Sequence, residues 1–486
     1  LVSFLELANF KTNLYDLRKP MKKNYIVAFD QGTTSTRAII FDRKGQIIKI
    51  AQKELTQHYP RPGWVEHDAG EIWDKTLKCA REVVGQDAPR IAAIGITNQR
   101  ETVVAWDRNS GEPLARAIVW QDRRTADFCA TMKADGHEVM VQKRTGLLLD
   151  PYFSGTKMRW MLDYDAAVQA AAQNGSLAFG TIESWLVYKL SGGDHVTDAS
   201  NASRTQLLAL DGANWDRGLC DLFGVPVAAL PDIVDNEGDF GAASPGLLGG
   251  AIRICGLAGD QQSATIGQGC LSPGPAKATL GTGAFILAPT GTVLPRSDNR
   301  LLGTILRQQG GRRHYALEGS IFVAGSLVKW LRDALGLVGS AQETEALARS
   351  VANNGGVSLL PALSGLGAPH WRPEARGVIA GLTQGTTRAH IVRAALESIA
   401  HQAHDLAGAF AADGAPWTSL RLDGGMSAND WIAQDLADLL DDVRLDTLGG
   451  FVENQQRRIQ RQGAADGQLL LLPPGQIATT TVAHFM

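Results

Sequence analysis

Residues 25–42 read YIVAFDQGTTSTRAIIFD, and their pattern indicates the fold most clearly. An apolar run ends in Asp30, a glycine and a cluster of hydroxyl residues follow, and a second apolar run then begins. Two short apolar runs on either side of such a turn predict a β-hairpin, and the Arg-Lys-Gly turn at 43–45 predicts a further strand. The hairpin would present an acid and several hydroxyls at the end of a buried strand.

A second strand–turn–strand unit lies far downstream, at residues 276–291. Here Gly281-Thr282-Gly283 separates two strand-like runs. Strand-like runs also end in polar residues at IAAIGITNQR and SLRLDGG, and helical spacing is clear from Ile391 to Phe410. Strands that alternate with helices indicate an α/β fold, and one Gly-Thr unit in each half predicts two related lobes.

Two helix starts carry capping patterns. Asp68 stands three residues before Glu71, which predicts a helix that begins after Asp68. Ser427 and Asp430 repeat this spacing after Asp-Gly-Gly, so we expect another helix to open at Ser427.

Composition excludes several classes of protein. The 486 residues carry a net charge of −3, and no basic stretch suggests a nucleic-acid partner. No apolar run is long enough to span a bilayer. Five scattered cysteines without a C-x-x-C pair favour reduced thiols in a cytoplasm over disulfides or a zinc site.

The two ends of the chain differ from the rest. Residues 1–20 lack the features of a signal peptide, and we expect a disordered extension ahead of Met21. Residues 447–486 show no sustained period, and we expect an atypical tail there.

The first hairpin has the chemistry of a phosphate site. Backbone N–H groups near a glycine can approach an anion, and the hydroxyls of Thr33, Thr34 and Ser35 can add hydrogen bonds. Asp30 could hold a magnesium ion, and Arg37 could neutralise charge. The P-loop pattern is absent, so a nucleotide would bind on hairpins and not at a P-loop helix. A purely structural polar turn is the alternative.

Asp260 follows a small-residue turn in GLAGDQQSA, after a strand-like run. An acid placed in this way can act as the general base when a phosphoryl group is transferred to a hydroxyl. It can also serve as the N-cap of the following helix. The two roles are compatible, and the residues alone leave both open.

Arg100 and Glu101 end a buried strand and offer a donor and an acceptor to the hydroxyls of a polyol. Adjacent opposite charges in such a place need partners or a ligand, although an exposed ion pair is the alternative. Tyr152, Phe153 and Trp120 could form an apolar wall for a short carbon chain, or belong to the core.

Taken together, these motifs resemble the FGGY carbohydrate kinases of the actin/hexokinase-like superfamily. The resemblance covers Met21 to about Asp446 and rests on DQGTTSTR, GITNQRET, AIVWQDRRT, DPYFSGTKMRW, SNASRT, GLAGDQQ, GTGAF, ALEGSIFVAG and LDGGMSAND, in this order. YFSGTKMRW and GVIAGLTQGTTRAHIVRAALE are similar to the two signatures of the family. The strings Q-R-E-T and W-Q-x-R-R point to its glycerol kinases over its xylulose, ribulose and gluconate kinases.

The resemblance implies a two-lobed, ribonuclease H-like ATPase fold with a central cleft. An N-terminal lobe at 21–256 would bind glycerol and phosphate, and a C-terminal lobe at 257–446 would bind nucleotide. The implied reaction is in-line transfer of the γ-phosphoryl group of ATP to glycerol, which yields sn-glycerol 3-phosphate and ADP. A cytoplasmic homo-oligomer, dimer or tetramer, is also implied.

The same resemblance assigns roles to individual residues. Asp260 would be the base, and Asp30 would serve Mg²⁺. The implied glycerol-binding set is Arg100, Glu101, Trp120, Tyr152, Asp260, Gln261 and Phe285. The implied ATP-binding set is Thr33, Thr34, Ser35, Arg37, Thr282, Gly325, Lys329, Gly425 and Asn429.

The chain departs from the family pattern in two places. Lys329 stands where the family often has a glutamine. After Asp446 the strand and small-residue helix of the family are replaced, so we expect an incomplete C-terminal lobe of lowered stability and activity. The alternatives are an inactive, actin-like nucleotide-binding remnant and a kinase of another small polyol.

Overall fold

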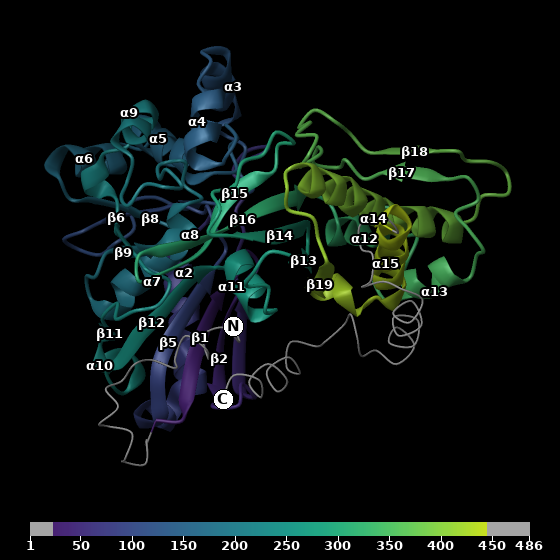
Figure 1. Cartoon of the computed structure of the whole chain (residues 1–486). Coiled ribbons are helices and arrows are strands. Elements are labelled where there is room, and N and C mark those ends of the chain that lie inside the picture. The colour runs from purple at the N-terminus through teal and green to yellow at the C-terminus, as the bar shows by residue number, and fades with distance from the viewer. Residues whose placement is uncertain (1–22, 445–486) are drawn as a thin grey trace.

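The structure is a computed structural model that describes residues 23–444, with side chains to residue 440. Among these residues, two large β-sheets and four two-stranded ones are formed (Figure 1). The expected extension at 1–20 and the expected tail at 447–486 lie outside the described residues. The first sheet has six strands in the order β11-β12-β5-β1-β2-β3. Their bounds are β1 Tyr25–Gln31, β2 Ser35–Asp42, β3 Ile47–Glu54, β5 Ile91–Asn98, β11 Ala242–Ala243 and β12 Ile252–Gly259.

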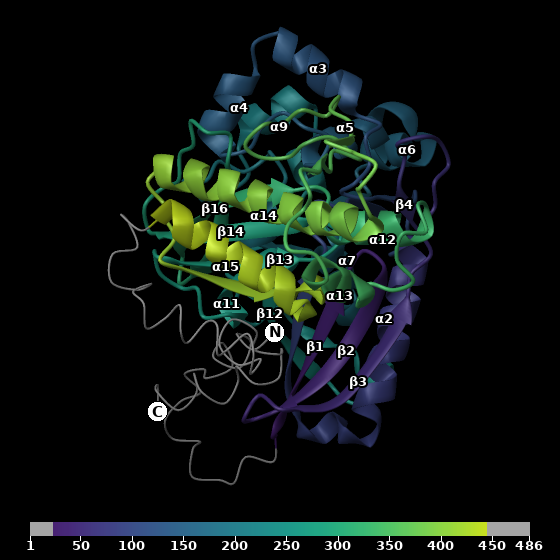
Figure 2. The ribbon, with the colours of Figure 1, turned by 90° about the vertical axis from the view of Figure 1, so that its right-hand side faces the viewer.

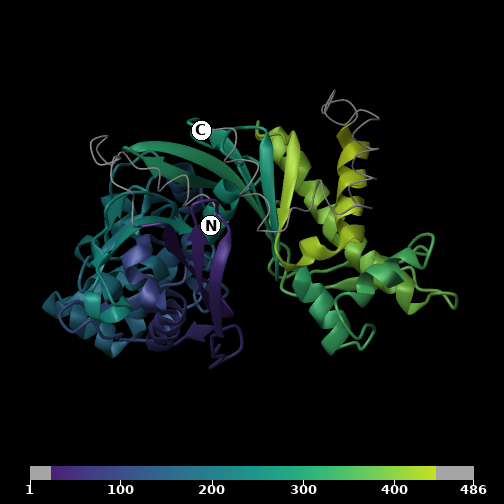
Figure 3. The ribbon, with the colours of Figure 1, turned by 90° about the horizontal axis from the view of Figure 1, so that it is seen from below.

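The second sheet has five strands in the order β15-β16-β14-β13-β19. In the view from below, its yellow-green strand β19 stands apart from the purple strands of the first sheet, while β15 and β16 extend toward the first half of the molecule and β15 contacts α8 (Ala199–Ala202) (Figure 3). Its strands are β13 Pro275–Leu280, β14 Ala284–Gly291, β15 Leu302–Gln309, β16 Arg312–Ile321 and β19 Ser419–Asp423.

The two sheets repeat one plan. β1 pairs antiparallel with β2 and parallel with β5, and β13 pairs antiparallel with β14 and parallel with β19. Both predicted hairpins are therefore confirmed, as are the strand of IAAIGITN and the strand that ends at Asp423. β12 pairs parallel with β5 on the far side of β1. Within residues 23–444, no strand takes the corresponding place beside β19.

Helix α2 (Ala69–Val84) packs against β2 and β3 of the first sheet, and its start confirms one capping prediction. The Asp68 carboxylate accepts a hydrogen bond from the Glu71 backbone N–H at 3.0 Å. The Glu71 carboxylate does not complete a capping box, because it accepts from the N–H and hydroxyl of Thr56 before the helix.

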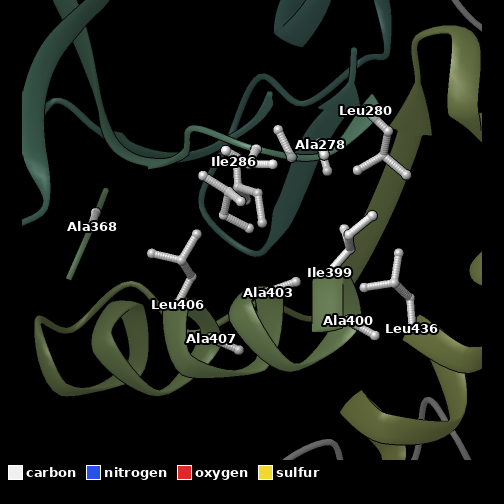
Figure 4. Packing of buried hydrophobic residues seen from close by; sticks show 14 of the residues in the cluster. Ala278, Leu280, Ile286, Ala368, Ile399, Ala400, Ala403, Leu406, Ala407 and Leu436 are labelled. Carbon is white, nitrogen blue, oxygen red and sulfur yellow. The ribbon is translucent and has the colours of Figure 1, made fainter. Parts of the chain in front are cut away.

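Helix α14 (Arg388–Ala412) covers the second sheet, as the spacing from Ile391 to Phe410 predicts. It runs alongside α15 (Asp430–Arg444), and both lie over the strands (Figure 2). Figure 4 shows the packing between helix and sheet, with Ile399, Ala403 and Leu406 on α14 and Ala278, Leu280 and Ile286 on β13 and β14.

The predicted start of α15 at Ser427 is wrong. Residues Gly425–Ala428 form a 3₁₀ turn, in which the Ser427 hydroxyl donates to the Gly424 carbonyl at 2.7 Å. Helix α15 then begins at Asp430, because the side-chain oxygen of Asn429 accepts from the N–H groups of Trp431 and Ile432, each at 3.1 Å.

Smaller elements complete the described chain. The remaining strands are β4 Glu66–His67, β6 Val104–Asp107, β7 Ala117–Ile118, β8 Leu177–Gly180, β9 Val196–Asp198, β10 Asp232–Val234, β17 Ser358–Leu360 and β18 Val378–Ala380. The remaining helices are α3 Ala126–Ala134, α4 Glu138–Thr145, α5 Ser154–Tyr164, α6 Ala166–Asn174, α7 Ile182–Ser191, α8 Ala199–Ala202, α9 Arg217–Phe223, α10 Pro245–Leu248, α11 Asp260–Gly267, α12 Gly325–Asp333 and α13 Glu343–Arg349. Among the helices described between 23 and 444, none has the length and apolarity that a membrane span would need.

Candidate active site

Arg100 lies at the centre of a buried network of charges. It follows β5, and its guanidinium donates to both carboxylate oxygens of Glu318, at 2.5 and 3.0 Å. Arg204 donates to Glu318 at 3.0 Å and to Glu101 at 2.6 Å. Since all four side chains are buried, the alternative of an exposed Arg100–Glu101 ion pair is wrong.

The network joins the two halves of the molecule. Glu318 lies on β16 of the second sheet, whereas Arg100 and Glu101 follow β5 of the first. Burial alone would raise the pKa of Glu318, but Arg100 and Arg204 hold it at about 2. Glu318 is therefore ionised at neutral pH, and its bidentate contact fixes the orientation of the Arg100 guanidinium.

Asp260 begins helix α11, directly after β12 ends at Gly259. Its carboxylate oxygen lies 3.4 Å from Arg100 Nε and accepts the Gln261 N–H at 2.7 Å. The N-cap of α11 is Gly259, so Asp260 occupies the first helical position and is not the predicted cap. An acid in the first turn of a helix is also favoured by the helix dipole.

The environment of Asp260 suits a base. Surrounding protein raises the pKa of its carboxyl to about 6, while Arg100 lowers it, Glu101 raises it and Lys277 lowers it. Protein surrounds the carboxyl on most sides, yet 36% of the side-chain surface remains accessible to solvent. A carboxyl that changes charge near neutral pH and remains accessible can exchange a proton with a bound hydroxyl.

Aromatic rings form one wall beside this acid. Trp120 packs edge-on against Tyr152 and Phe285, with ring centroids 5.6 and 6.0 Å apart. The Tyr152 hydroxyl lies 3.4 Å from the Arg100 guanidinium. The structure therefore brings together the aromatic residues and the charged residues of the glycerol-binding set that the resemblance implies.

The same wall contacts the first hairpin. The indole N–H of Trp120 donates to the Thr33 hydroxyl at 2.9 Å. Asp30, at the end of β1, pairs with Arg37 at 3.3 Å, and the Ser35 hydroxyl accepts from Gln52 at 3.1 Å. The expected phosphate turn and the expected polyol wall are thus direct neighbours.

The second hairpin is tied to helix α12. The Thr282 carbonyl accepts the N–H groups of Ala324 and Ser326, both at 3.0 Å. A Cβ on Gly325 would lie 2.5 Å from the Gly281 carbonyl oxygen, so this close approach requires glycine. Lys329 is exposed on the same helix, one turn further on.

The last two predicted nucleotide residues lie near the start of α15. Gly425 opens the 3₁₀ turn, and Asn429 follows it. The Asn429 amide nitrogen donates to Thr344 at 3.1 Å while its oxygen caps α15. Both ends of the Asn429 side chain therefore have protein partners. Gly425 remains open to a ligand, because no described atom lies within 4 Å of the position that a Cβ would take there.

The residues around Asp30 fit a magnesium ion that arrives with a nucleotide. Among the described residues, no group of three or more His, Cys, Asp or Glu side chains is placed to hold a metal by itself. Magnesium is commonly held by one or two carboxylates together with phosphate and water. A single carboxylate beside hydroxyls matches that mode of binding.

Three charged residues of the site were not predicted from the sequence. Glu318 and Lys277 each stand in a mainly apolar stretch, YALEGSI and AKATL, and a charge in such a place signals a buried partner. Arg204 is the fifth residue of SNASRT and is completely buried. Their partners are remote in sequence, so the signal indicates burial but not the contact.

The sequence matches models of a known family twice. The N-terminal domain of the FGGY family of carbohydrate kinases matches residues 25–267, and the C-terminal domain of that family matches residues 276–448. A glycerol kinase from Rhodospirillum rubrum is 54% identical over 420 residues, which are 85% of each chain. A glycerol kinase from Dechloromonas aromatica is 55% identical over 421 residues, covering 86% of this chain and 84% of its own.

Solved structures agree with these matches. The crystal structure of Plasmodium falciparum glycerol kinase with ADP has a TM-score of 0.80 at 37% identity, covering 86% of this chain and 85% of its own. A gluconate kinase from Lactobacillus acidophilus, with a TM-score of 0.77 at 23% identity, covers 93% of this chain and 91% of its own and shares the fold.

Proposed function

The chain belongs to the FGGY family of carbohydrate kinases, and we propose that the site around Asp260 transfers the γ-phosphoryl group of ATP to glycerol. Glycerol phosphorylation is the activity of relatives that are 53–55% identical over 85–86% of this chain, and it is the activity of this enzyme. The observation that carries the assignment of the site is the contact between Arg100 and Asp260, inside a network that reaches Thr33 through Tyr152 and Trp120.

Glycerol binding would use charged and apolar groups on different sides. Arg100, held by Glu318, offers a donor whose direction is fixed, and Glu101 offers a carboxylate that Arg204 holds in place. The edge-to-face rings of Trp120 and its neighbours offer an apolar surface to the carbon chain. A preformed site of this kind loses little entropy when it orders a small polyol.

Phosphoryl transfer requires one hydroxyl of glycerol to attack the γ-phosphorus as the bond to the bridging oxygen breaks. Asp260 accepts the hydroxyl proton, and ADP leaves with the electron pair of the broken bond. Because the transition state is loose, positioning and charge neutralisation contribute more than early deprotonation. Backbone N–H groups and hydroxyls of the two Gly-Thr hairpins would hold the phosphates in line.

ATP use follows from family membership, and the finer assignments are part of the proposal. A magnesium ion bound with the nucleotide would supply positive charge that neutralises the phosphates. Asp30 would hold it, with Thr33, Thr34, Ser35 and Arg37 at the phosphates. The second side of the nucleotide site would comprise Thr282, Gly325, Lys329, Gly425 and Asn429. The proposed assembly is a cytoplasmic homo-oligomer.

The alternatives have less support. No observation on residues 23–444 favours an inactive remnant, since the base, the charged network and both hairpins are present. A different small polyol would have to fit between the same Arg100–Glu101 pair and the same ring of Trp120.

A substrate panel tests the proposal. Purified protein is mixed with ATP, magnesium and either glycerol, dihydroxyacetone, erythritol or xylulose, and ADP formation is followed by a coupled assay. We expect glycerol to give the highest kcat/KM and sn-glycerol 3-phosphate as the product. Nucleotide binding without turnover of any polyol, or a higher kcat/KM with xylulose, would contradict the proposal.

A further inference from the structure

Lys277 is a completely buried lysine on β13 that the mechanism above does not use. Its ammonium donates to the side-chain oxygen of Gln261 at 2.7 Å and to the Thr279 hydroxyl at 2.7 Å. Thr279 in turn donates to Asp423 at 2.5 Å. The chain of bonds therefore runs from β19, through β13, to the residue that follows Asp260 on α11.

The chemistry of these groups fixes the direction of each bond. An ammonium has donors only, so the amide of Gln261 has to turn its oxygen toward Lys277. Its Nε2 group is then the end left to face a ligand. A carboxylate accepts only, so the Thr279 hydroxyl donates to Asp423 and accepts from Lys277. The orientation of Gln261 is thus imposed by its neighbour.

Charged groups face Lys277 from every element around it. Burial lowers the pKa of its ammonium, Asp423 on β19 and Asp260 on α11 raise it, Arg100 beyond β5 lowers it, and Glu318 on β16 raises it. The net result is a pKa below the ordinary value for lysine, because the effect of burial exceeds that of the three carboxylates that oppose it.

The influence is mutual at Asp260. Burial is the largest cause and raises the pKa of the Asp260 carboxyl. Among the nearby charges, Arg100 lowers this pKa, Glu101 raises it and Lys277 lowers it. Arg100 already has a carboxylate partner in Glu318, whereas Lys277 donates to two neutral side chains. Lys277 is therefore a source of positive charge near Asp260, and among the described residues no carboxylate contacts its ammonium directly.

We propose that Lys277 is a positioning residue for the phosphoryl acceptor. It turns the Gln261 amide so that Nε2 donates to an oxygen of the bound polyol, and its charge stabilises the Asp260 carboxylate. This inference rests on the proposed function of the site. It adds a residue that determines both the affinity for the polyol and the pH at which the base works.

The variant Lys277→Met removes the donor and the charge while keeping much of the volume. We expect the KM and the calorimetric Kd for glycerol to rise by about tenfold, the size of one lost hydrogen bond to a ligand. We also expect the acid limb of the pH profile of kcat/KM to move to higher pH, which a merely structural role would not cause. Lys277→Gln keeps a donor but no charge, so it should move the acid limb with a smaller change in KM.

A double-mutant cycle with Gln261→Ala tests whether Lys277 acts through Gln261. The two effects on the Kd for glycerol should then be strongly non-additive. The matched control is Lys189→Met, because Lys189 donates to the Gly111 carbonyl at 3.1 Å and stacks over Trp185, away from Asp260. It should leave both the KM and the acid limb unchanged.

The outcomes separate the two claims. Wild-type protein that neither binds nor phosphorylates glycerol would overturn the proposed function together with this inference. Active wild-type protein whose Lys277→Met and Lys277→Gln variants keep the wild-type Kd and acid limb would overturn the inference alone. If the effects of the Lys277 and Gln261 substitutions on the Kd for glycerol are additive, the inference that Lys277 acts through Gln261 is overturned. If Lys277→Met does not fold, the Lys277→Gln variant decides by the same two readouts.

Discussion

The Asp260 carboxyl is largely surrounded by protein and is nevertheless accessible to solvent. The surrounding protein brings its pKa to about 6, yet part of the carboxyl remains accessible to a ligand. The proton on this carboxyl is therefore favoured in the folded chain, relative to the ordinary value of 3.8 in an unfolded one. A carboxyl whose pKa is raised in this way reduces the stability of the fold at neutral pH.

The substitution Asp260→Asn should therefore stabilise the protein at neutral pH. A raised pKa in the folded state contributes stability that is fully present below pH 3.8 and lost as the pH rises through about 6. Asparagine does not titrate, so the Tm of the variant should exceed that of the wild type at pH 7.5. The difference should vanish below about pH 4. Differential scanning fluorimetry between pH 4 and 8 measures both.

An exposed aspartate provides the contrast. A hydrogen bond from Arg332 lowers the pKa of Asp333, so its ionised form is the favoured one. Asp333→Asn should thus leave the Tm at pH 7.5 unchanged or slightly lower. A rise in Tm for both variants, or for neither, would contradict the raised pKa of Asp260 in the folded protein.

The sequence indicates which residues belong to the site better than it indicates which residues they contact. Asp260, Arg100 and Glu101 are recognisable because each ends a strand with a charge. Glu318 is 218 residues from Arg100 and 114 from Arg204, so no local pattern links them. Only the folded chain shows that the Arg100–Glu101 pair belongs to a larger, charge-balanced network.

Helix α14 packs against the second sheet. One side of it fills the core of the second half of the molecule, and Leu406 is completely buried there. A Cβ on Gly319 of β16 would lie 2.7 Å from the Leu406 side chain, so helix and strand are in close contact. The neighbouring residue on that strand is Glu318, which holds Arg100. Packing of α14 thus supports the strand that orients the site.

The substitution Leu406→Ala should lower the free energy of unfolding by about 2–5 kcal/mol, because it leaves a cavity in a packed core. Urea denaturation followed by tryptophan fluorescence measures this, since Trp417 and Trp431 lie in the same cluster. The control Leu360→Ala removes a leucine that is 40% exposed on β17, and it should change stability by less than about 0.5 kcal/mol. Equal effects would contradict the described packing.

Helix starts show why some elements are predictable and others are not. The cap at Asp68 follows the sequence rule, since the acceptor is the residue just before the helix. At α15 the same spacing of Ser427 and Asp430 is misleading, because a 3₁₀ turn intervenes and Asn429 makes the cap. At α11 the cap is Gly259, because strand β12 runs directly into the helix and leaves no room for a separate capping residue.

The two large sheets of the molecule each contain a hairpin with a parallel strand beside it. Two Gly-Thr turns far apart in the sequence predict this duplication, because each turn has to end a strand pair. The sequence does not show that the halves meet through buried charges, with β16 supplying Glu318 to residues that follow β5. It also does not show that Trp120 reaches across to Thr33, since that contact spans 87 residues.

In the proposed mechanism, Asp260 removes a proton from glycerol while the network around Arg100 holds the substrate. The most direct test compares wild-type protein with Asp260→Asn in two assays, ATP-dependent formation of sn-glycerol 3-phosphate and calorimetric binding of glycerol. We predict that the variant binds glycerol with a Kd close to that of the wild type and that its kcat falls at least about 100-fold, the contribution expected of a general base. A variant that keeps a kcat near the wild-type value would contradict the account.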